Sequence, residues 1–496
     1  MWKIVRLPVR VRVFLCVCCL GLVCSDEASG QSQRLELGRR LQRFEKAWEL
    51  AEPAERSACV GPLKTAVSNF FSLRLSEAGR QLDVAWQRAR GLDMASEFEQ
   101  SVVGLQLIAQ PVCADTEQQS LKIQLRPFYE TVKQPPLDTR LSFRLQDASG
   151  ACLAETSFPL SAVQSSVEWT TGKLSEGDHR LSVQLQSGAD SFAIPDVTIS
   201  RIAGFSERLA ALQKNSEKAA ASSASEKAAE AVTTVPPTVG ATIRSTATFL
   251  KSLSEARSQE TDFPALARLE LCEDLVAEGA AVTEVLSRRD QSQDLWLTLA
   301  NGRRTVATRI RCPVLTQAPV PVLFVFHGAG GSENMFFEAY GAGRVIQEAE
   351  KRGWLVVAPA QGILGLSLGI SEMLVALESC FSIDRNRVML LGHSMGAAQV
   401  MRQMQLHPTI PKAAVALGGG GQMRVSDAKT FAATPWFIAA GKEDFGRRGA
   451  MQLHQSLLEA GGNSRYKDYE DVEHLVIVQA AIDDTFQFLE TTISER

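Results

Sequence analysis

The spacing of apolar residues changes along the chain and divides it into stretches with different expected structures. Over residues 34–100 apolar side chains recur every three or four positions, which is the period of an amphipathic helix. A first helix is marked by Leu37, Leu41, Phe44 and Trp48, and a second spans residues 67–86. Pro53 and Gly61-Pro62 separate the two, since such residues interrupt helices. The pattern predicts a helical hairpin over residues 31–101.

The apolar period then shortens to two, which is the period of a half-buried strand. Alternation is clear in residues 121–125, 141–145 and 181–185, and turn residues such as Ser149-Gly150 separate these runs. We expect a small β-sandwich-like domain over residues 102–202. Its expected role is interaction or spacing, with a protein partner or a carbohydrate as possible ligands of the N-terminal domains. Trp169 is a weak signal for carbohydrate, because no other aromatic residue clusters with it.

Residues 203–292 return to a helical pattern and include a stretch of biased composition. Residues 214–234 are rich in Ala, Ser, Lys and Glu, and Pro236-Pro237 follows them. Such a stretch is either a helical spacer or a flexible linker.

From residue 293 to residue 496 apolar runs of strand length alternate with amphipathic segments. The expected strands are residues 320–326, 354–358, 388–391, 413–417 and 436–440, and the expected helices are residues 339–352, 371–381, 395–406 and 449–460. Continuous apolar strands with helical crossovers are typical of a mostly parallel, doubly wound sheet that is covered on both faces. The fold class expected for this part is therefore α/β.

Composition and the first residues narrow the setting in which the protein works. The 496 residues are 45% hydrophobic and 22% charged, with a formal net charge of −4, so nothing indicates a nucleic-acid partner. Basic residues at positions 3, 6, 10 and 12 precede a short apolar run over residues 13–24 and a small-residue stretch at Ala28-Ser29-Gly30. Residues 1–30 are typical of a secretory signal. We therefore expect export to the periplasm, the cell surface or the medium, with membrane attachment only if the segment is retained.

The ten cysteines fit an exported chain without fixing any disulfide. Four lie in the expected signal and six follow it, at positions 59, 113, 152, 272, 312 and 380. An even number permits disulfides, and buried free thiols are an equally open interpretation. None of the spacings is that of a metal site.

Candidate chemistry begins at residues 392–396, which read Gly-His-Ser-Met-Gly. This G-x-S-x-G motif lies between an expected strand and an expected helix, as a nucleophile elbow requires. The turn is so sharp that Gly392 and Gly396 approach one another and must both lack a Cβ. The hydroxyl of Ser394 then projects from the sheet, and the helix behind it presents its N-terminal N–H groups. Ser394 is the candidate nucleophile.

A glycine-rich loop, His327-Gly328-Ala329-Gly330-Gly331, follows the expected strand that ends at residue 326. Backbone N–H groups of such a loop can bind the oxyanion of an acyl-transfer intermediate. The expected donors are Ala329, with Gly328 less favoured, and Met395. His327 is expected to be a structural hydrogen-bonding residue rather than a proton carrier.

The acid and the base are expected beyond the nucleophile. Asp444 follows the strand at residues 436–440, where a carboxylate can orient an imidazole. The adjacent Glu443 is expected to point elsewhere, and Asp468 and Asp471 are weaker alternatives. Among six histidines, His474 alone lies in a late loop that no other motif or element claims. The resulting order Ser394, Asp444, His474 is that of α/β-hydrolases.

Residues 300–490 thus resemble the α/β-hydrolase superfamily. They are most similar to the secreted polyhydroxybutyrate depolymerase and feruloyl esterase-like group, with prolyl oligopeptidase-type hydrolases close by. The resemblance rests on residues 321–331, residues 382–388, the Ser394 elbow, Asp444 and His474. It implies a serine hydrolase without metal or cofactor. The residues before 290 resemble no family.

Three functions follow as hypotheses. The first is an exported esterase acting on a small-molecule or polymer ester through an acyl-enzyme. The second is a serine peptidase of prolyl oligopeptidase type, although the β-propeller repeats of that type are missing from the sequence. The third is a non-enzymatic interaction protein with a relic hydrolase domain.

Only 18 residues, 418–435, separate two of the strands, so no cap domain fits there and we expect Ser394 in an open cleft. The N-terminal domains or residues 360–370 are the segments that could complete it.

Overall fold

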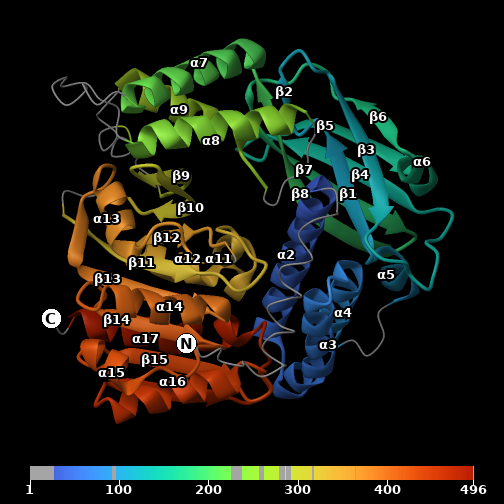
Figure 1. Cartoon of the computed structure of the whole chain (residues 1–496). Coiled ribbons are helices and arrows are strands. Elements are labelled where there is room, and N and C mark those ends of the chain that lie inside the picture. The colour runs from blue at the N-terminus through green and yellow to red at the C-terminus, as the bar shows by residue number, and fades with distance from the viewer. Residues whose placement is uncertain are drawn as a thin grey trace, which may run out of the picture.

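The computed structural model describes residues 27–91, 96–224, 237–255, 262–278, 285, 292–314, 318–362 and 365–494. Its strands form sheets of three, five and eight strands. Figure 1 shows a helical N-terminal part, a β-sandwich beside it, a helical layer, and a C-terminal part built on the eight-stranded sheet. The expected signal, with its four cysteines, lies outside the described residues except for its last few positions.

The N-terminal helices differ from the expected hairpin. They are α2 (Glu27–Leu50), α3 (Pro53–Phe71), α4 (Leu75–Ala89) and the short α5 (Glu97–Val102). Pro53 begins α3, but Gly61-Pro62 lies inside α3 instead of between helices. Pro62 has no N–H for the carbonyl of Ala58, and a guanidinium nitrogen of Arg88 on α4 donates to that carbonyl at 2.8 Å. A contact from a neighbouring helix thus satisfies the acceptor that the proline leaves free.

A buried polar network joins α2 to α4 and to the sandwich. Arg40 and Arg43 of α2 both form ion pairs with Asp83 of α4. The hydroxyl of Tyr129 donates to the same carboxylate at 2.7 Å, and Arg40 donates to the carbonyl of Val103 at 3.0 Å. Because a buried charge is costly without partners, these contacts fix the position of α2.

The sandwich consists of two sheets with the apolar side chains of their inner faces buried. One sheet has the order β1 (Leu105–Gln110), β3 (Ser120–Pro127), β6 (Val167–Thr170). The other has the order β2 (Cys113–Asp115), β8 (Asp190–Ile202), β7 (Gly177–Ser187), β4 (Arg140–Gln146), β5 (Cys152–Pro159), and α6 (Leu160–Ser165) follows β5. Trp169 is buried, with its ring 6.2 Å from that of Phe143. Its ring therefore belongs to the core and offers no exposed face to a sugar.

The helical layer covers one edge of the eight-stranded sheet. It consists of α7 (Phe205–Ala224), α8 (Pro237–Ser254) and α9 (Ala265–Glu278), and residues 225–236 of the expected linker lie outside the described residues. Strand β9 is the edge, and the hydroxyl of Thr242 on α8 accepts a hydrogen bond from the N–H of Thr298 at 2.9 Å. Side chains of α8 thus satisfy backbone groups that an exposed edge would leave unpaired.

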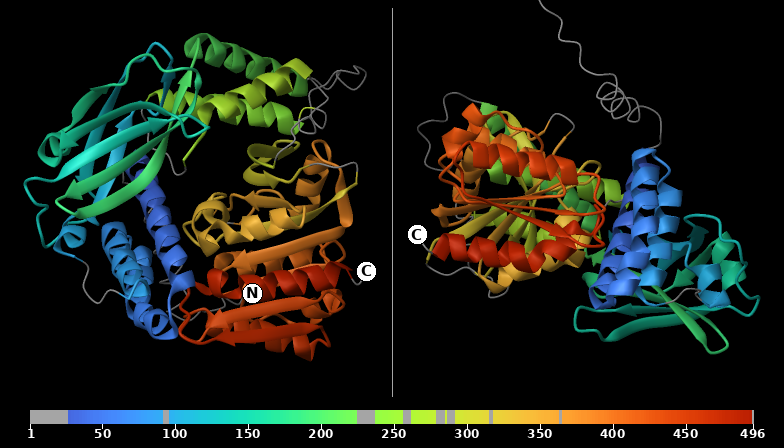
Figure 2. Two further views of the ribbon diagram at one scale, coloured as in Figure 1. Left: turned by 180° about the vertical axis from the view of Figure 1, so that it is seen from behind. Right: turned by 90° about the horizontal axis from the view of Figure 1, so that it is seen from below.

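The C-terminal part has the mixed α/β architecture that the alternating pattern predicts. The strand order is β16 (Ser464–Tyr469), β15 (Trp436–Gly441), β14 (Ala413–Leu417), β13 (Ile383–His393), β11 (Val320–Phe326), β12 (Leu355–Pro359), β10 (Arg304–Cys312), β9 (Gln293–Asn301). The first six run parallel, and β10 runs antiparallel to both of its neighbours, β12 and β9. One face packs against α12 (Arg344–Lys351) and α17 (Ile477–Ser494), and the other against α13 (Ile370–Glu378), α14 (Met395–Leu406) and α16 (Arg447–Glu459). Figure 2 shows the helices on both sides of the sheet.

The helix expected over residues 339–352 is broken in the structure. After α11 (Met335–Glu338) the chain forms a tight turn, η2 (Tyr340–Gly343), and α12 starts only at Arg344. Gly341 and Ala342 have φ values of 61° and 51° inside this turn. The side chain of Glu45 on α2 accepts a hydrogen bond from the N–H of Ala342 at 2.7 Å. The break coincides with this tertiary contact, which local periodicity does not reveal.

The apolar character of the helices and the state of the cysteines complete the description of the fold. Within the described part of the chain no helix combines the length and apolar character needed to cross a membrane. The six cysteines after the expected signal are free thiols, buried except for Cys152.

Candidate active site

Ser394 occupies a strained position between β13 and α14. Its φ and ψ are 58° and −116°, a conformation that residues with a side chain rarely adopt. A Cβ on Gly392 would lie 2.1 Å from the carbonyl oxygen of Gly396, so the two glycines do approach one another. A Cβ on Gly396 would instead meet the carbonyl oxygen of Phe326 at 1.9 Å, because the elbow also presses against the end of β11. Steric exclusion on both sides holds the turn.

His474 and Asp444 lie together in the loops that follow β16 and β15. Nδ1 of His474 is 2.7 Å from Oδ1 of Asp444, and both side chains are buried. The N–H of Gly446 donates to the same oxygen at 2.6 Å, which fixes the carboxylate. With Nδ1 donating to the acid, Nε2 of His474 is left to accept a proton.

The neighbouring carboxylates are engaged elsewhere. Asp468 accepts two hydrogen bonds from Arg447, at 2.9 and 2.7 Å. Glu443 forms an ion pair with Lys64 of α3. The choice of Asp444 among the acids near the end of β15 therefore agrees with the geometry.

The glycine-rich loop lies directly against the serine. A Cβ on Gly328 would be 3.3 Å from Cβ of Ser394. Burial raises the pKa of the Tyr340 hydroxyl, and a hydrogen bond from the Gly328 backbone opposes this shift. A Cβ on Gly328 would lie 2.8 Å from the Tyr340 hydroxyl, so this hydroxyl packs against the loop. Ala329 follows directly and stays the expected donor of the loop. Met395 is the first residue of α14, and its N–H has no acceptor within the helix.

His327 shapes this loop. Its Nδ1 lies 2.8 Å from the carbonyl oxygen of Gly328, and its Nε2 accepts from the N–H of Gln361 at 3.1 Å. Burial lowers the pKa of His327 to about 4. The ring is therefore neutral at physiological pH and has both nitrogens occupied, which fits a structural role.

His393 has a positioning role that the sequence did not reveal. Its Nε2 lies 3.0 Å from the carbonyl oxygen of His474, and its ring centroid is 4.6 Å from that of Tyr340. Burial lowers the pKa of His393 far below its usual value, so the ring stays neutral. Its ring N–H thus ties the loop that carries His474 to the elbow. The signal available in the sequence was its place beside the nucleophile.

The remaining histidines serve local structure. Nε2 of His179 lies 2.9 Å from the carbonyl of Ser175, Nδ1 of His454 lies 2.9 Å from the hydroxyl of Ser464, and His407 ends α14. Across the described residues no group of three or more His, Cys, Asp or Glu side chains is placed to hold a metal ion.

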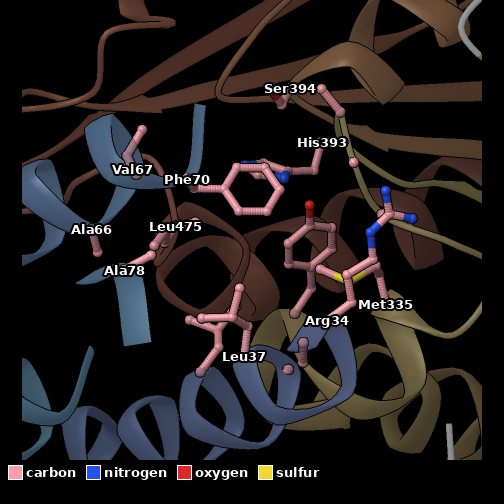
Figure 3. Close-up of a pocket in the computed structure, with 18 of the residues that line it drawn as sticks. Arg34, Leu37, Ala66, Val67, Phe70, Ala78, Met335, His393, Ser394 and Leu475 are labelled. Atoms are coloured by element: carbon pink, nitrogen blue, oxygen red, sulfur yellow. The ribbon is translucent and has the colours of Figure 1, made fainter. Parts of the chain in front are cut away.

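Ser394 opens into a pocket that the N-terminal helices cover. The cavity measures about 120 Å³ and is lined by both Ser394 and His474. In Figure 3 the Phe70 ring lies between Ser394 at the top and Leu37 at the bottom. The residues contributed by α2–α4 are Arg34, Leu35, Leu37, Gly38, Leu41, Ala66, Val67, Phe70, Phe71, Ala78 and Leu82.

The expectation that the N-terminal domains could complete the cleft agrees with the residues that line the cavity. Residues 418–435 hold only the short α15 (Val425–Ala428) and η3 (Lys429–Phe431), so no cap is inserted there, as expected. The cover comes instead from α2–α4, far earlier in the chain. None of the described residues among 360–370 lines the cavity.

Glu473, next to the candidate base, gives a pH-dependent prediction. Burial raises the pKa of Glu473 to about 7, and the hydrogen bond from the N–H of Leu475 opposes this shift. The folded chain thus binds this proton more tightly than the unfolded chain. The stability that this adds is complete below about pH 4.5 and is lost as pH rises through 7, by at most about 3 kcal/mol.

We expect Glu473→Gln to lose less stability than the wild type between pH 5 and pH 8, because glutamine keeps the acceptor without ionising. Unfolding in urea at the two pH values measures this difference. Glu470→Gln, at an exposed position, is the matched control and should behave like the wild type. Equal pH dependence of wild type and Glu473→Gln would contradict the expectation.

Comparison with known proteins gives structural neighbours only. No model of a protein family matches the sequence, and no curated protein matches it. A thermostable esterase is 20% identical over 42% of this chain and 63% of its own, with a TM-score of 0.35. A ferulic acid esterase is 17% identical over 41% of this chain and 100% of its own, with a TM-score of 0.36. A fluorophosphonate-binding serine hydrolase of Staphylococcus aureus is 14% identical over 40% and 98%, with a TM-score of 0.34. TM-scores this low carry no weight for substrate or mechanism.

Proposed function

We propose that this protein is an exported serine hydrolase that cleaves carboxylic esters, with Ser394 as nucleophile, His474 as base and Asp444 as the acid that orients it. The observation that carries the proposal is the buried 2.7 Å contact between Asp444 and His474, which lines the same pocket as Ser394. The proposal of export rests on the composition of residues 1–30.

The mechanism follows from the positions of these groups. Nε2 of His474 takes the proton of Ser394 as its oxygen attacks the ester carbonyl, and Asp444 stabilises the imidazolium that forms. The N–H groups of Ala329 and Met395 bind the oxyanion. His474 then protonates the leaving alcohol, and water hydrolyses the acyl-enzyme by the same steps in reverse order.

The strained serine argues against a relic domain. A non-glycine residue in such a conformation costs on the order of 1–3 kcal/mol and persists where function requires it. Ser394 and His474 line one pocket, and the acid Asp444 contacts His474. We therefore favour an enzyme over a non-enzymatic interaction protein. A peptidase of prolyl oligopeptidase type would use the same residues, and proline-containing peptide amides distinguish it from an esterase.

The test is covalent labelling followed by turnover. A small fluorophosphonate should label the intact protein, and peptide mapping should place the label on Ser394. The p-nitrophenyl esters of acetate and butanoate should be hydrolysed, and proline-containing peptide amides should not. A label on another serine, or turnover of peptide amides alone, would overturn the proposal. The N-terminal sequence of protein recovered outside the cytoplasm tests export.

A further inference from the structure

Helices α2–α4 are fixed to the catalytic part beside its active site. The buried carboxylate of Glu45 accepts the N–H of Ala342 in the η2 turn at 2.7 Å. Near the end of α2, Glu49 forms an ion pair with Arg344 at 3.0 Å. Figure 1 shows α2 and α3 standing against the catalytic part. These helices are therefore a built wall of the site, positioned by buried contacts.

Aromatic side chains of α3 extend this wall to the catalytic groups. A Cβ on Gly330 would lie 2.6 Å from Cζ of Phe70, so the ring packs on the oxyanion loop. Phe71 contacts Phe445 edge to face, with centroids 6.0 Å apart. The Phe445 ring in turn lies 4.0 Å from that of His474. Helix α3 thus touches both the oxyanion loop and the base side of the site.

The cavity enclosed in this way is apolar away from the catalytic groups. Its cap side consists mainly of aliphatic and aromatic side chains, among them Leu37, Leu41, Val67 and Leu82, and Met335 adds to it from the catalytic part. Arg34, Ser332, Asn334 and Glu338 also line the cavity and have no part in the proposed mechanism, but apolar atoms make up most of its surface. A charged or strongly hydrated group would lose its water against a surface that is mostly apolar, so the cavity favours an apolar ligand.

Cavity size limits that ligand. A dry apolar cavity of roughly 150 Å³ accommodates one benzene ring. The cavity here measures about 120 Å³. It therefore has room for a compact apolar group of about three to five carbons beyond the reacting carbonyl.

Resting on the proposed function, we propose that α2–α4 form the acyl pocket of this hydrolase and select a compact apolar acyl group of butanoyl to hexanoyl size. The group in the enclosed cavity is the acyl group, because it stays bonded to Ser394 through both half-reactions. The alcohol must leave and water must enter between them, which requires the open side. The pocket-forming residues are specificity determinants and take no part in the chemistry.

The test compares two ester series with two variants. With p-nitrophenyl esters, kcat/KM of the wild type should rise about three- to fourfold per methylene from acetate to hexanoate and fall for dodecanoate. Leu37→Ala should raise the ratio of octanoate to butanoate about tenfold by enlarging the cavity. Ala78→Leu should lower the ratio of hexanoate to acetate about tenfold by filling it. Ala54→Leu, exposed on α3, is the matched control and should leave both ratios unchanged.

Two controls separate the outcomes. Labelling by the small fluorophosphonate shows that each variant is folded with a working nucleophile. A wild-type protein that shows neither labelling nor turnover would reject the proposed function itself. Ratios that stay within twofold of wild type in labelled variants would overturn the acyl pocket. Butanoate esters of different alcohols form the second series, and a change confined to that series would show that the cavity binds the alcohol.

Discussion

Replacing Ser394 with alanine is expected to reduce kcat for p-nitrophenyl butanoate by about 10⁶-fold, because no other group can form the acyl-enzyme. Alanine keeps the Cβ at this backbone position, so the melting temperature should stay close to that of the wild type. Steady-state turnover and thermal unfolding of the same preparation measure the two properties.

Ser379→Ala is the matched control for this change. Ser379 directly follows α13, and its hydroxyl donates to the carbonyl of Ala376 within that helix. Ser379 does not line the pocket. Its turnover should remain near the wild-type value. Residual activity of Ser394→Ala above about 1% would assign the nucleophile to another residue.

Asp444→Asn should lower kcat by about 10⁴-fold with little change in the fold. The carboxylate oxygen that faces Nδ1 of His474 also accepts the N–H of Gly446. The amide oxygen can still accept both contacts, but the neutral amide no longer stabilises the imidazolium that forms when His474 takes the proton of Ser394. Stopped-flow or steady-state assays with p-nitrophenyl butanoate give the rate, and circular dichroism checks the fold.

Asp468→Asn provides the comparison within the same region of the sheet. This carboxylate is held by Arg447 near the surface and lies outside the pocket. We expect its kcat to change less than about threefold. A larger loss for Asp468→Asn than for Asp444→Asn would exchange the roles of the two acids.

Helices α2–α4, which cover the pocket, limit the substrates that could reach Ser394. An open cleft would accept long or polymeric esters, whereas a cavity closed by α2–α4 selects by the size of the acyl group. The same helices carry the Phe71 ring that packs on Phe445 beside His474. A substitution at the distant N-terminal helices can thus alter both selectivity and the placement of the base.

Local patterns predicted the catalytic part well. The strand at residues 413–417 and the helix at residues 395–406 have the bounds that periodicity indicated. The prediction of one helix over residues 339–352 was wrong, because a turn interrupts it and Glu45 binds the backbone of that turn. The hairpin at residues 31–101 failed as well, because Arg88 allows Pro62 inside α3. In both cases a side chain from elsewhere supplied the missing hydrogen-bonding partner.

The sequence by itself determined the elements of the parallel sheet, the elbow at Ser394 and the candidate order of nucleophile, acid and base. These follow from interactions within a few residues, such as the steric need for glycine at positions 392 and 396. Only the tertiary structure decided that α2–α4 close the pocket. Periodicity shows that Leu37 and Leu41 face something apolar, but it carries no information about which distant segment they face. In the structure they line the pocket that contains Ser394.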